Sequence, residues 1–283
     1  RIDEALAVPV VAGWKSRRDQ QNRTPAGART AVGAPSRHAC AVCAMLAGVR
    51  DGALYEEIRK AGLQNHVWQW QSFAVFSQYR RVFEATRRYL QPGAVALDWG
   101  CGNGHFSFFL VRHGVRSIGY SFEGAPPLLA GEPLFEHRRG DPRAPVKLPF
   151  DDHAFDLVFS IGVLEHVHEA GGNARGSILE LERVLKPGGH FLCFHLPNRY
   201  GWGENLRRVL KRLGAAEEFH SVLYTSRSFG DLLRATTFEV VETWRYGWLP
   251  RNRLGHLPAF LSEASAGVAI LHSIDAGLGR GLT

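Results

Sequence analysis

The chain has 283 residues, 45% of them hydrophobic and 11% aromatic, so it can bury one good-sized core with flanking segments. Its formal net charge is +7, but the excess cations gather in residues 9–39 and 199–213, which argues against a protein that binds nucleic acid over its whole surface. The sequence contains neither a run of about 18 apolar residues nor an opening signal segment, which predicts a soluble cytoplasmic protein.

The N-terminal region offers few structural signals. Residues 1–39 are rich in Ala, Gly, Pro and Arg and show no apolar period, which predicts a partly disordered arm and cap over residues 1–71. Position 1 is Arg rather than Met, as in a fragment of a longer chain. Cys40 and Cys43 have the spacing of half a zinc site, but no second pair follows, so two ordinary thiols are the simpler interpretation.

A helix and a strand precede the most informative turn of the chain. Apolar residues recur at helical spacing after Ser72, which is placed to cap that helix, and residues 91–93 lead on to a strand. The strand at 95–97 ends on Asp98 and breaks into a glycine-rich turn, after which residues 105–114 predict another helix. A helix that starts at such a turn presents free N–H groups at the carboxyl end of the strand. The order of strand, acidic residue, glycine turn and helix therefore predicts a nucleotide-type site.

The glycine turn reads LDWGCGNG over residues 97–104. Its spacing is G-x-G-x-G rather than G-x-G-x-x-G, and Asp98 stands two residues before the first glycine. A carboxylate at this position would repel a pyrophosphate but would hold an ammonium group or a ribose hydroxyl. The turn resembles motif I of the class I S-adenosylmethionine-dependent methyltransferases. The spacing disfavours the rival class, the nicotinamide-dependent oxidoreductases.

A second strand is predicted at residues 115–122, and its end departs from the family pattern. Ser121 stands at the position where this family usually has an acidic residue that binds the ribose, and the nearest carboxylate is Glu123. The resemblance therefore implies a ribose contact from one of these two residues. The letters GYSFEG also resemble the nucleophile elbow of hydrolases, but the second glycine falls one place late for that motif.

The segment 134–198 extends the resemblance. It predicts a strand, a GD turn, an LPF-DD loop, a strand at 155–159, a helix that ends at KPGG, and a strand at 190–196. These features resemble the small-molecule methyltransferases of type 11, and the likeness covers residues 94–198 nearly without gaps. By carry-over, it implies cofactor contacts at Asp98, Gly100, Cys101, Gly102, Gly104, Asp141, Ser160 and Ile161.

The part of the chain after residue 198 no longer follows the family pattern. Residues 204–213 predict an amphipathic helix with leucines and a valine on one face and cations on the other. This helix can pack on the core with a solvated basic side, or it can meet an anionic lipid or a phosphorylated substrate. A helix capped by Thr225 or Ser226 and a strand follow, and residues 251–283 predict a helical or irregular tail.

We therefore expect an α/β fold with a Rossmann-like, mainly parallel sheet and helices on both faces, formed by a methyltransferase domain at residues 72–250. A complete member of the family adds a seventh, antiparallel strand between strands five and six. Residues 251–283 offer only one short apolar run, so we expect this C-terminal strand to be short or missing.

The resemblance implies methyl transfer from S-adenosylmethionine to a small-molecule acceptor, and the histidines near the carboxyl edge favour an oxygen nucleophile. Anionic and lipid-linked compounds are among the candidate acceptors, no nucleic acid is expected as a partner, and residues 204–213 are a candidate for peripheral membrane contact. The alternative is a non-catalytic, methyltransferase-like regulatory protein, because Ser121 departs from the cofactor-binding pattern.

Two histidines are the candidates for the catalytic base. Glu165 and His166 lie just beyond the strand at 155–159, and His195 ends the next strand, so both imidazoles are expected at the same carboxyl edge. Imidazole, with an ordinary pKa of about 6.5, can accept a hydroxyl proton at neutral pH. We assign His166 as the base, with His195 orienting the substrate beside Glu165; packing of His166 on its own helix is the structural alternative. The three residues also resemble part of an E-x-x-E-H metal set, but the first Glu is Gly162 here, so no metal is predicted.

Overall fold

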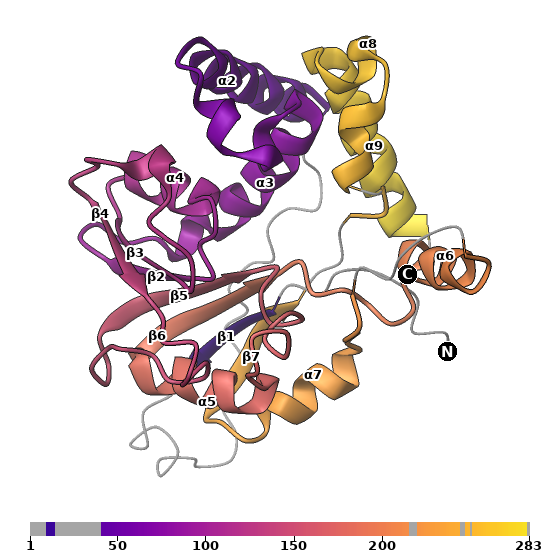
Figure 1. Ribbon diagram of the computed structural model, residues 1–283. Helices are drawn as coiled ribbons and strands as arrows, with labels where there is room; N and C mark the ends of the chain where they lie inside the picture. The colour runs from indigo at the N-terminus through magenta and orange to yellow at the C-terminus, as the bar shows by residue number, and fades with distance from the viewer. Residues whose placement is uncertain (1–9, 15–40, 215–219, 244–246, 250, 282–283) are drawn as a thin grey trace, which may run out of the picture.

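A seven-stranded sheet forms the centre of the computed structural model, which describes residues 10–14, 41–214, 220–243, 247–249 and 251–281 (Figure 1). The strands are β1 (Val10–Trp14), β2 (Val95–Trp99), β3 (Arg116–Ser121), β4 (Phe135–Arg139), β5 (Phe155–Ile161), β6 (Leu185–Phe194) and β7 (Phe238–Thr243). Their order across the sheet is β4-β3-β2-β5-β6-β1-β7.

Six of these strands run in the same direction. The pairs β2–β3, β3–β4, β2–β5 and β5–β6 are parallel, and β7 shares the direction of β6 because β1 is antiparallel to both. Parallel strands that are joined through helices bring their carboxyl ends to one edge of the sheet. The predicted Rossmann-like fold is confirmed, and this edge is where a ligand is expected.

The antiparallel strand comes from the N-terminus. β1 lies between β6 and β7, the position at which the family's seventh strand was expected from the C-terminus. The described residues after β7 contain helices and no strand, so the predicted absence of a full C-terminal strand is confirmed for them. The sheet nevertheless has a five-residue strand in that position, because the N-terminal segment supplies it, and this was not predicted. The interpretation of residues 1–39 as an arm was wrong for residues 10–14. The rest of that arm and the Cys40–Cys43 pair lie outside the described side chains.

Helices cover both faces of the sheet, as predicted (Figure 1). On one face lie α2 (Ala41–Lys60), α3 (Phe73–Thr86), α4 (His105–Arg112), α8 (Ala259–Ser262) and α9 (Ser265–Gly281); on the other lie α5 (Ala174–Val184) and α7 (Ser226–Leu233). The remaining helix, α6 (Trp202–Arg212), lies at the periphery. Because α2 packs against both α3 and α9, the segments predicted to flank the domain at its two ends meet over one face.

Each face has its own apolar core. Phe76, Phe83 and Phe109 are almost fully buried between α3, α4 and the sheet, with ring centroids of neighbouring pairs 5.4 and 5.8 Å apart. Ile178 and Leu181 of α5 are fully buried against the opposite face. The strands β2, β5 and β6 are therefore buried on both sides, which explains why they read as continuous apolar runs.

The predicted helix starts are confirmed by their caps. The Ser72 hydroxyl accepts a hydrogen bond from Val75 N at 3.3 Å, and Thr225 forms a capping box with Ser228 at the start of α7. α5 ends at Val184, two residues before the KPGG segment, which lies within β6 rather than in a separate turn. Among the described residues, none of the helices combines the length and the hydropathy that crossing a bilayer requires.

Candidate active site

The turn between β2 and α4 is built as the glycine spacing predicts. Gly100, Gly102 and Gly104 have φ values of +77°, +47° and +76°, in the left-handed region that other residues rarely adopt. Gly100 N and Cys101 N donate to the same carbonyl, Tyr120 O, at 2.8 and 3.1 Å, which ties the turn to the end of β3. The backbone of the turn is thereby held at the carboxyl edge of the sheet.

A cavity of about 440 Å³ opens against this turn. Five of the predicted site residues line it: Gly100, Gly102, Ser121, Glu123 and His166. Its other walls include aromatic and apolar side chains that the sequence analysis did not single out, among them Trp99, Tyr120, Phe122, Val163 and Val167, together with Glu169. The cavity therefore reaches from the glycine turn to the loop after β5, and combines apolar walls with a few polar groups.

The two candidates for the ribose contact differ in their surroundings. Ser121 is buried at the end of β3, and its hydroxyl lies 3.1 Å from Nε2 of His137 on β4. Burial lowers the pKa of His137, so this imidazole is neutral and shares a hydrogen bond with the serine. Glu123 is exposed in the cavity wall. The Glu123 carboxylate is therefore better placed than the Ser121 hydroxyl to accept a new hydrogen bond from a ligand.

Asp98 is buried, with 2% of its surface exposed. Its Oδ2 accepts hydrogen bonds from Ser107 N at 3.1 Å and from Ser107 Oγ at 2.7 Å, so the carboxylate anchors the first turns of α4. Burial raises the pKa of Asp98 from 3.8 to about 6, although the bonds to Ser107 oppose this shift. At neutral pH the fold holds a buried negative charge beside the glycine turn.

This charge leads to a prediction about stability. Because the folded pKa is raised, the unfolded chain loses its proton first, and the free energy of unfolding falls as the pH rises from 3.8 to about 6. Replacing Asp98 by Asn should therefore raise the free energy of unfolding of the cofactor-free protein at pH 7 by roughly 2–3 kcal/mol. The same change should weaken S-adenosylmethionine binding roughly 10- to 150-fold, through loss of a charge-assisted contact.

Denaturant titrations at pH 7 and near pH 4, with calorimetry at pH 7, measure both effects. The stabilisation should shrink toward zero at the lower pH. A variant that bound the cofactor as tightly as the parent would remove Asp98 from the cofactor site.

The remaining predicted cofactor contacts have mainly structural surroundings. Cys101 is a buried thiol whose pKa is raised by burial. Asp141 is exposed, and its Oδ1 accepts from Arg143 N at 2.9 Å in the turn after β4. Ser160 is fully buried in β5 and Ile161 ends that strand, whereas the cavity wall begins one residue later at Gly162. Their roles toward a cofactor remain predictions.

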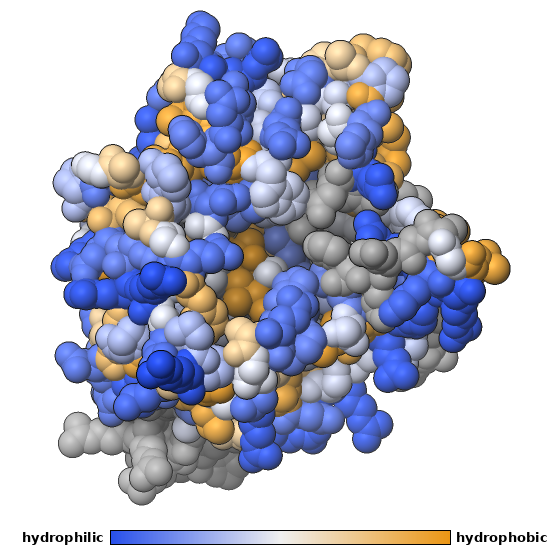
Figure 2. All heavy atoms as spheres, viewed as in Figure 1, coloured by the Kyte–Doolittle hydropathy of each residue, from blue (hydrophilic) through white to orange (hydrophobic). Residues whose placement is uncertain are grey.

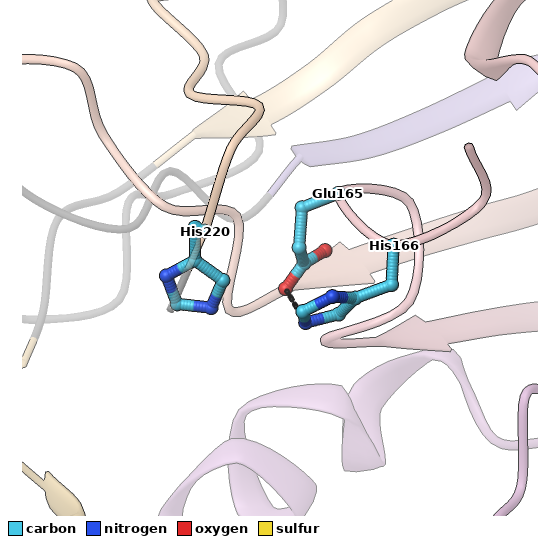
Figure 3. Close-up of side chains that lie close together, drawn as sticks. All are labelled: Glu165, His166 and His220. Carbon is cyan, nitrogen blue, oxygen red and sulfur yellow. Dashed lines mark ion pairs between the residues drawn. The ribbon is translucent and has the colours of Figure 1, made fainter. Parts of the chain in front are cut away.

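The loop after β5 brings Glu165 and His166 together with a histidine that the sequence analysis missed. His166 Nε2 lies 4.0 Å from Glu165 Oε1, and the ring centroids of His166 and His220 are 5.3 Å apart (Figure 3). Each imidazole is also held from outside, because His166 Nδ1 lies 2.8 Å from Glu169 Oε1 and His220 Nδ1 lies 2.9 Å from an oxygen of Glu204. His166 Nε2 is thus turned toward the buried Glu165 carboxylate, and a ring nitrogen of His220 lies within 4.8 Å of both residues.

Long-range contacts place His220 in this cluster. The hydroxyl of Tyr224 donates to Leu164 O at 3.2 Å, and Tyr224 N donates to Pro197 O at 2.9 Å. These bonds hold the start of α7 against the ends of β5 and β6. Since more than 50 residues separate His220 from His166 in the sequence, no local spacing signalled their proximity.

His195 lies at the same edge but in a different setting. It follows β6 directly, with φ +65°, and its ring packs edge-on against Tyr79 with centroids 5.3 Å apart. Tyr79 also packs edge-on against His105 at 4.7 Å, so it joins the end of β6 to the start of α4. The structure therefore groups His166 with His220, whereas His195 belongs to the contact between α3 and the sheet.

A parallel sheet with a glycine turn after a central strand, an acid before that turn and a cavity beside it define the class I S-adenosylmethionine-dependent methyltransferases. The model of a methyltransferase domain family, type 11, matches residues 97–193, which span β2 to β6. A protein from Encephalitozoon cuniculi that carries the name of a methyltransferase is 31% identical over 156 residues, which are 53% of this chain and 68% of that protein. The chain belongs to this methyltransferase family, whose cofactor is S-adenosylmethionine.

Other relatives are similar over shorter stretches. The probable tRNA methyltransferase 9B of Mus musculus is 32% identical over 117 residues, or 40% of this chain and 25% of that protein. The tRNA U34 carboxymethyltransferase of Methylococcus capsulatus is 30% identical over 161 residues, or 50% of this chain and 47% of that protein. The chain thus spans about a quarter to a half of the length of these two relatives.

The residues present fit S-adenosylmethionine. A Cβ built at Gly102 would meet no atom closer than 4.0 Å, so the backbone of the turn faces open space where a ligand can approach. Trp99, Tyr120 and Phe122 supply apolar walls, and Glu123 supplies an acceptor for hydroxyl groups. When bound, this cofactor supplies an electrophilic methyl group on a sulfonium.

Proposed function

We propose that this protein transfers the methyl group of S-adenosylmethionine to an oxygen atom of a small-molecule acceptor. The observation that supports this most is the continuity of one cavity, which is lined at one end by the glycine turn and at the other by His166. A methyl donor and a proton acceptor can thus share one cavity. Such alignment contributes most of the rate in a direct displacement.

In this proposal His166 removes the acceptor proton. With Nδ1 donating to Glu169, Nε2 carries the lone pair that accepts a proton, as in other imidazole–carboxylate pairs. The buried Glu165 carboxylate, 4.0 Å from Nε2, stabilises the imidazolium that results. The ring of His220 packs beside that of His166. His195, whose ring packs against Tyr79, orients the substrate.

The same cluster has the residue types of a metal site. Within the part of the chain that the structure describes, Glu165, His166 and His220 are the group whose potential ligand atoms all lie within 4.8 Å of one another. Ligands about 2.0–2.2 Å from a tetrahedral zinc ion lie roughly 3.3 Å apart, closer than the 4.0 Å between Nε2 and Oε1 here. Proton transfer therefore suits the geometry as it stands, and metal dependence is the alternative that the test must decide.

Glu123 and Ser121 allow a prediction about cofactor binding. Glu123→Gln should weaken S-adenosylmethionine binding at least about tenfold, because it removes a charge-assisted hydrogen bond to the ribose. Ser121→Ala should cost about tenfold at most, since this hydroxyl already bonds to His137. Calorimetry on both variants ranks them, with Glu136→Gln on the neighbouring strand as a charge-matched control. The reverse ranking would make Ser121 the ribose contact.

The experiment that tests the proposed function has two stages. Calorimetry with S-adenosylmethionine, S-adenosylhomocysteine and NAD comes first, and absence of binding to all three would favour the regulatory alternative. Transfer of labelled methyl to a panel of hydroxylated metabolites and lipid-linked compounds follows, with and without a chelator. Because two relatives carry tRNA in their names, bulk tRNA is included, and labelling of tRNA alone would replace the small-molecule acceptor.

A further inference from the structure

The peripheral helix α6 carries an apolar stripe that stays exposed in the part of the chain that the structure describes. Trp202, Leu206, Val209 and Leu213 recur at positions i, i+4, i+7 and i+11, which lie on one side of a helix. Their exposed fractions are 45%, 49%, 50% and 73%, and none of the residues of α6 is buried. At the place of α6, Figure 2 shows apolar atoms on the outer edge beside hydrophilic ones.

Glu204 on the polar side of α6 contacts another part of the chain, because its carboxylate lies 2.9 Å from Nδ1 of His220. Asn205 and Arg208 bond within the helix segment, to Gly201 O and to Asn205 Oδ1. Trp202 of the stripe also contacts the protein through its ring nitrogen, because its Nε1 donates to Trp248 O at 2.8 Å. A helix that packs on a protein core normally buries its apolar stripe, whereas Leu206, Val209 and Leu213 are about half exposed or more. The packed arrangement considered from the sequence is therefore not the one that the structure adopts.

Exposed cations border the stripe. Lys211 and Arg212 are exposed at its C-terminal end, and Arg199 is exposed just before the helix beside Tyr200, which is itself 49% exposed. A second copy of this chain would bring the same cations to the contact, so self-association through this surface is opposed by like charges. An anionic lipid surface matches both the apolar stripe and the cations, because its acyl chains are apolar and its headgroups are negatively charged. Aromatic side chains such as those of Tyr200 and Trp202 favour the boundary between headgroups and acyl chains.

We propose that α6 docks the protein on an anionic lipid surface, with the stripe of Trp202, Leu206, Val209 and Leu213 inserted at the boundary between headgroups and acyl chains. This inference goes beyond the proposed function, because lipid binding does not require methyl transfer. It also relates the two sites: through the Glu204–His220 hydrogen bond, the docked helix contacts the cluster that faces the acceptor end of the cavity. An acceptor held in the lipid surface would approach from that side.

The test is co-sedimentation of the full chain with vesicles of phosphatidylcholine, alone or mixed with phosphatidylglycerol, at low and high salt. The parent should bind the mixed vesicles at low salt and lose binding at high salt. Leu206→Gln with Val209→Gln should weaken binding at least tenfold, since each buried CH₂ contributes about fourfold. Lys211→Gln with Arg212→Gln should weaken vesicle binding roughly 25-fold, at about fivefold per cation.

The matched control changes an exposed leucine and an exposed arginine on α5, as Leu179→Gln with Arg175→Gln, and should leave vesicle binding unchanged. Circular dichroism and S-adenosylmethionine affinity check that every variant is folded. Absence of parent binding to mixed vesicles would overturn the proposal. So would a parent dimer that Leu206→Gln with Val209→Gln converts to monomers, because the stripe would then be a contact between copies.

Discussion

Replacing His166 by Ala is expected to lower kcat/KM for methyl transfer by about 10²–10⁴-fold while S-adenosylmethionine affinity stays within about threefold of the parent. The imidazole lies in the wall of the cavity, held by Glu169 on one side and beside the buried Glu165 carboxylate on the other. No other imidazole in the described chain lines this cavity. Loss of His166 therefore removes the proton acceptor without removing the glycine turn that holds the cofactor.

The pH dependence of the rate distinguishes a base from a packing residue. A general base gives kcat/KM a decline toward acidic pH, and this decline should be absent from the residual activity of His166→Ala. Glu169→Gln should retain more activity than His166→Ala, because Glu169 acts only through the orientation of the imidazole.

Two controls accompany this prediction. His168 is exposed and bonds to Ser221, so His168→Ala should keep near-parental kcat/KM. His195→Ala tests the assigned positioning role and should raise KM more than it lowers kcat. Full activity of His166→Ala with the cofactor bound would falsify its assignment as the base. Activity that disappears with chelator and returns with a divalent ion would instead make Glu165, His166 and His220 a metal site.

Replacing Gly100 by Ala is expected to lower the free energy of unfolding by about 2–4 kcal/mol and to reduce S-adenosylmethionine binding at least about a hundredfold. Two costs combine at this position. The φ of +77° is unfavourable for any residue with a Cβ, and that Cβ would lie 2.5 and 2.7 Å from the two Cγ atoms of Val163. Since Val163 lines the cavity, any movement that relieves the clash changes the shape of the cofactor site.

Gly114 provides the matched control. It has a similar φ, +73°, but a Cβ there would meet no atom within 4 Å. Gly114→Ala should therefore show only the backbone cost, about 1–2 kcal/mol, with cofactor affinity unchanged. Thermal or denaturant unfolding and calorimetry on both variants measure the difference. Equal losses of stability for the two variants would show that contact with Val163 is unimportant.

These two glycines illustrate how far sequence reasoning reaches. The need for glycine at 100, 102 and 104 follows from the tight turn between a strand and a helix, which is local information and was predicted correctly. The caps at Ser72 and Thr225 were predicted for the same reason, because a hydroxyl that caps a helix acts within four residues of itself. The clash between position 100 and Val163 was not foreseeable, since 63 residues separate them in the sequence.

By itself, the sequence determined the class of fold, the position of the glycine turn and the strand after which His166 stands. Each of these follows from hydrophobic period, turn chemistry or short motifs, which act between neighbours along the chain. The tertiary structure alone decided that β1 completes the sheet, that His220 joins Glu165 and His166, and that α6 turns its apolar stripe outward. These outcomes depend on which distant segments pair and which faces find a partner, and a local pattern of residues does not contain that information.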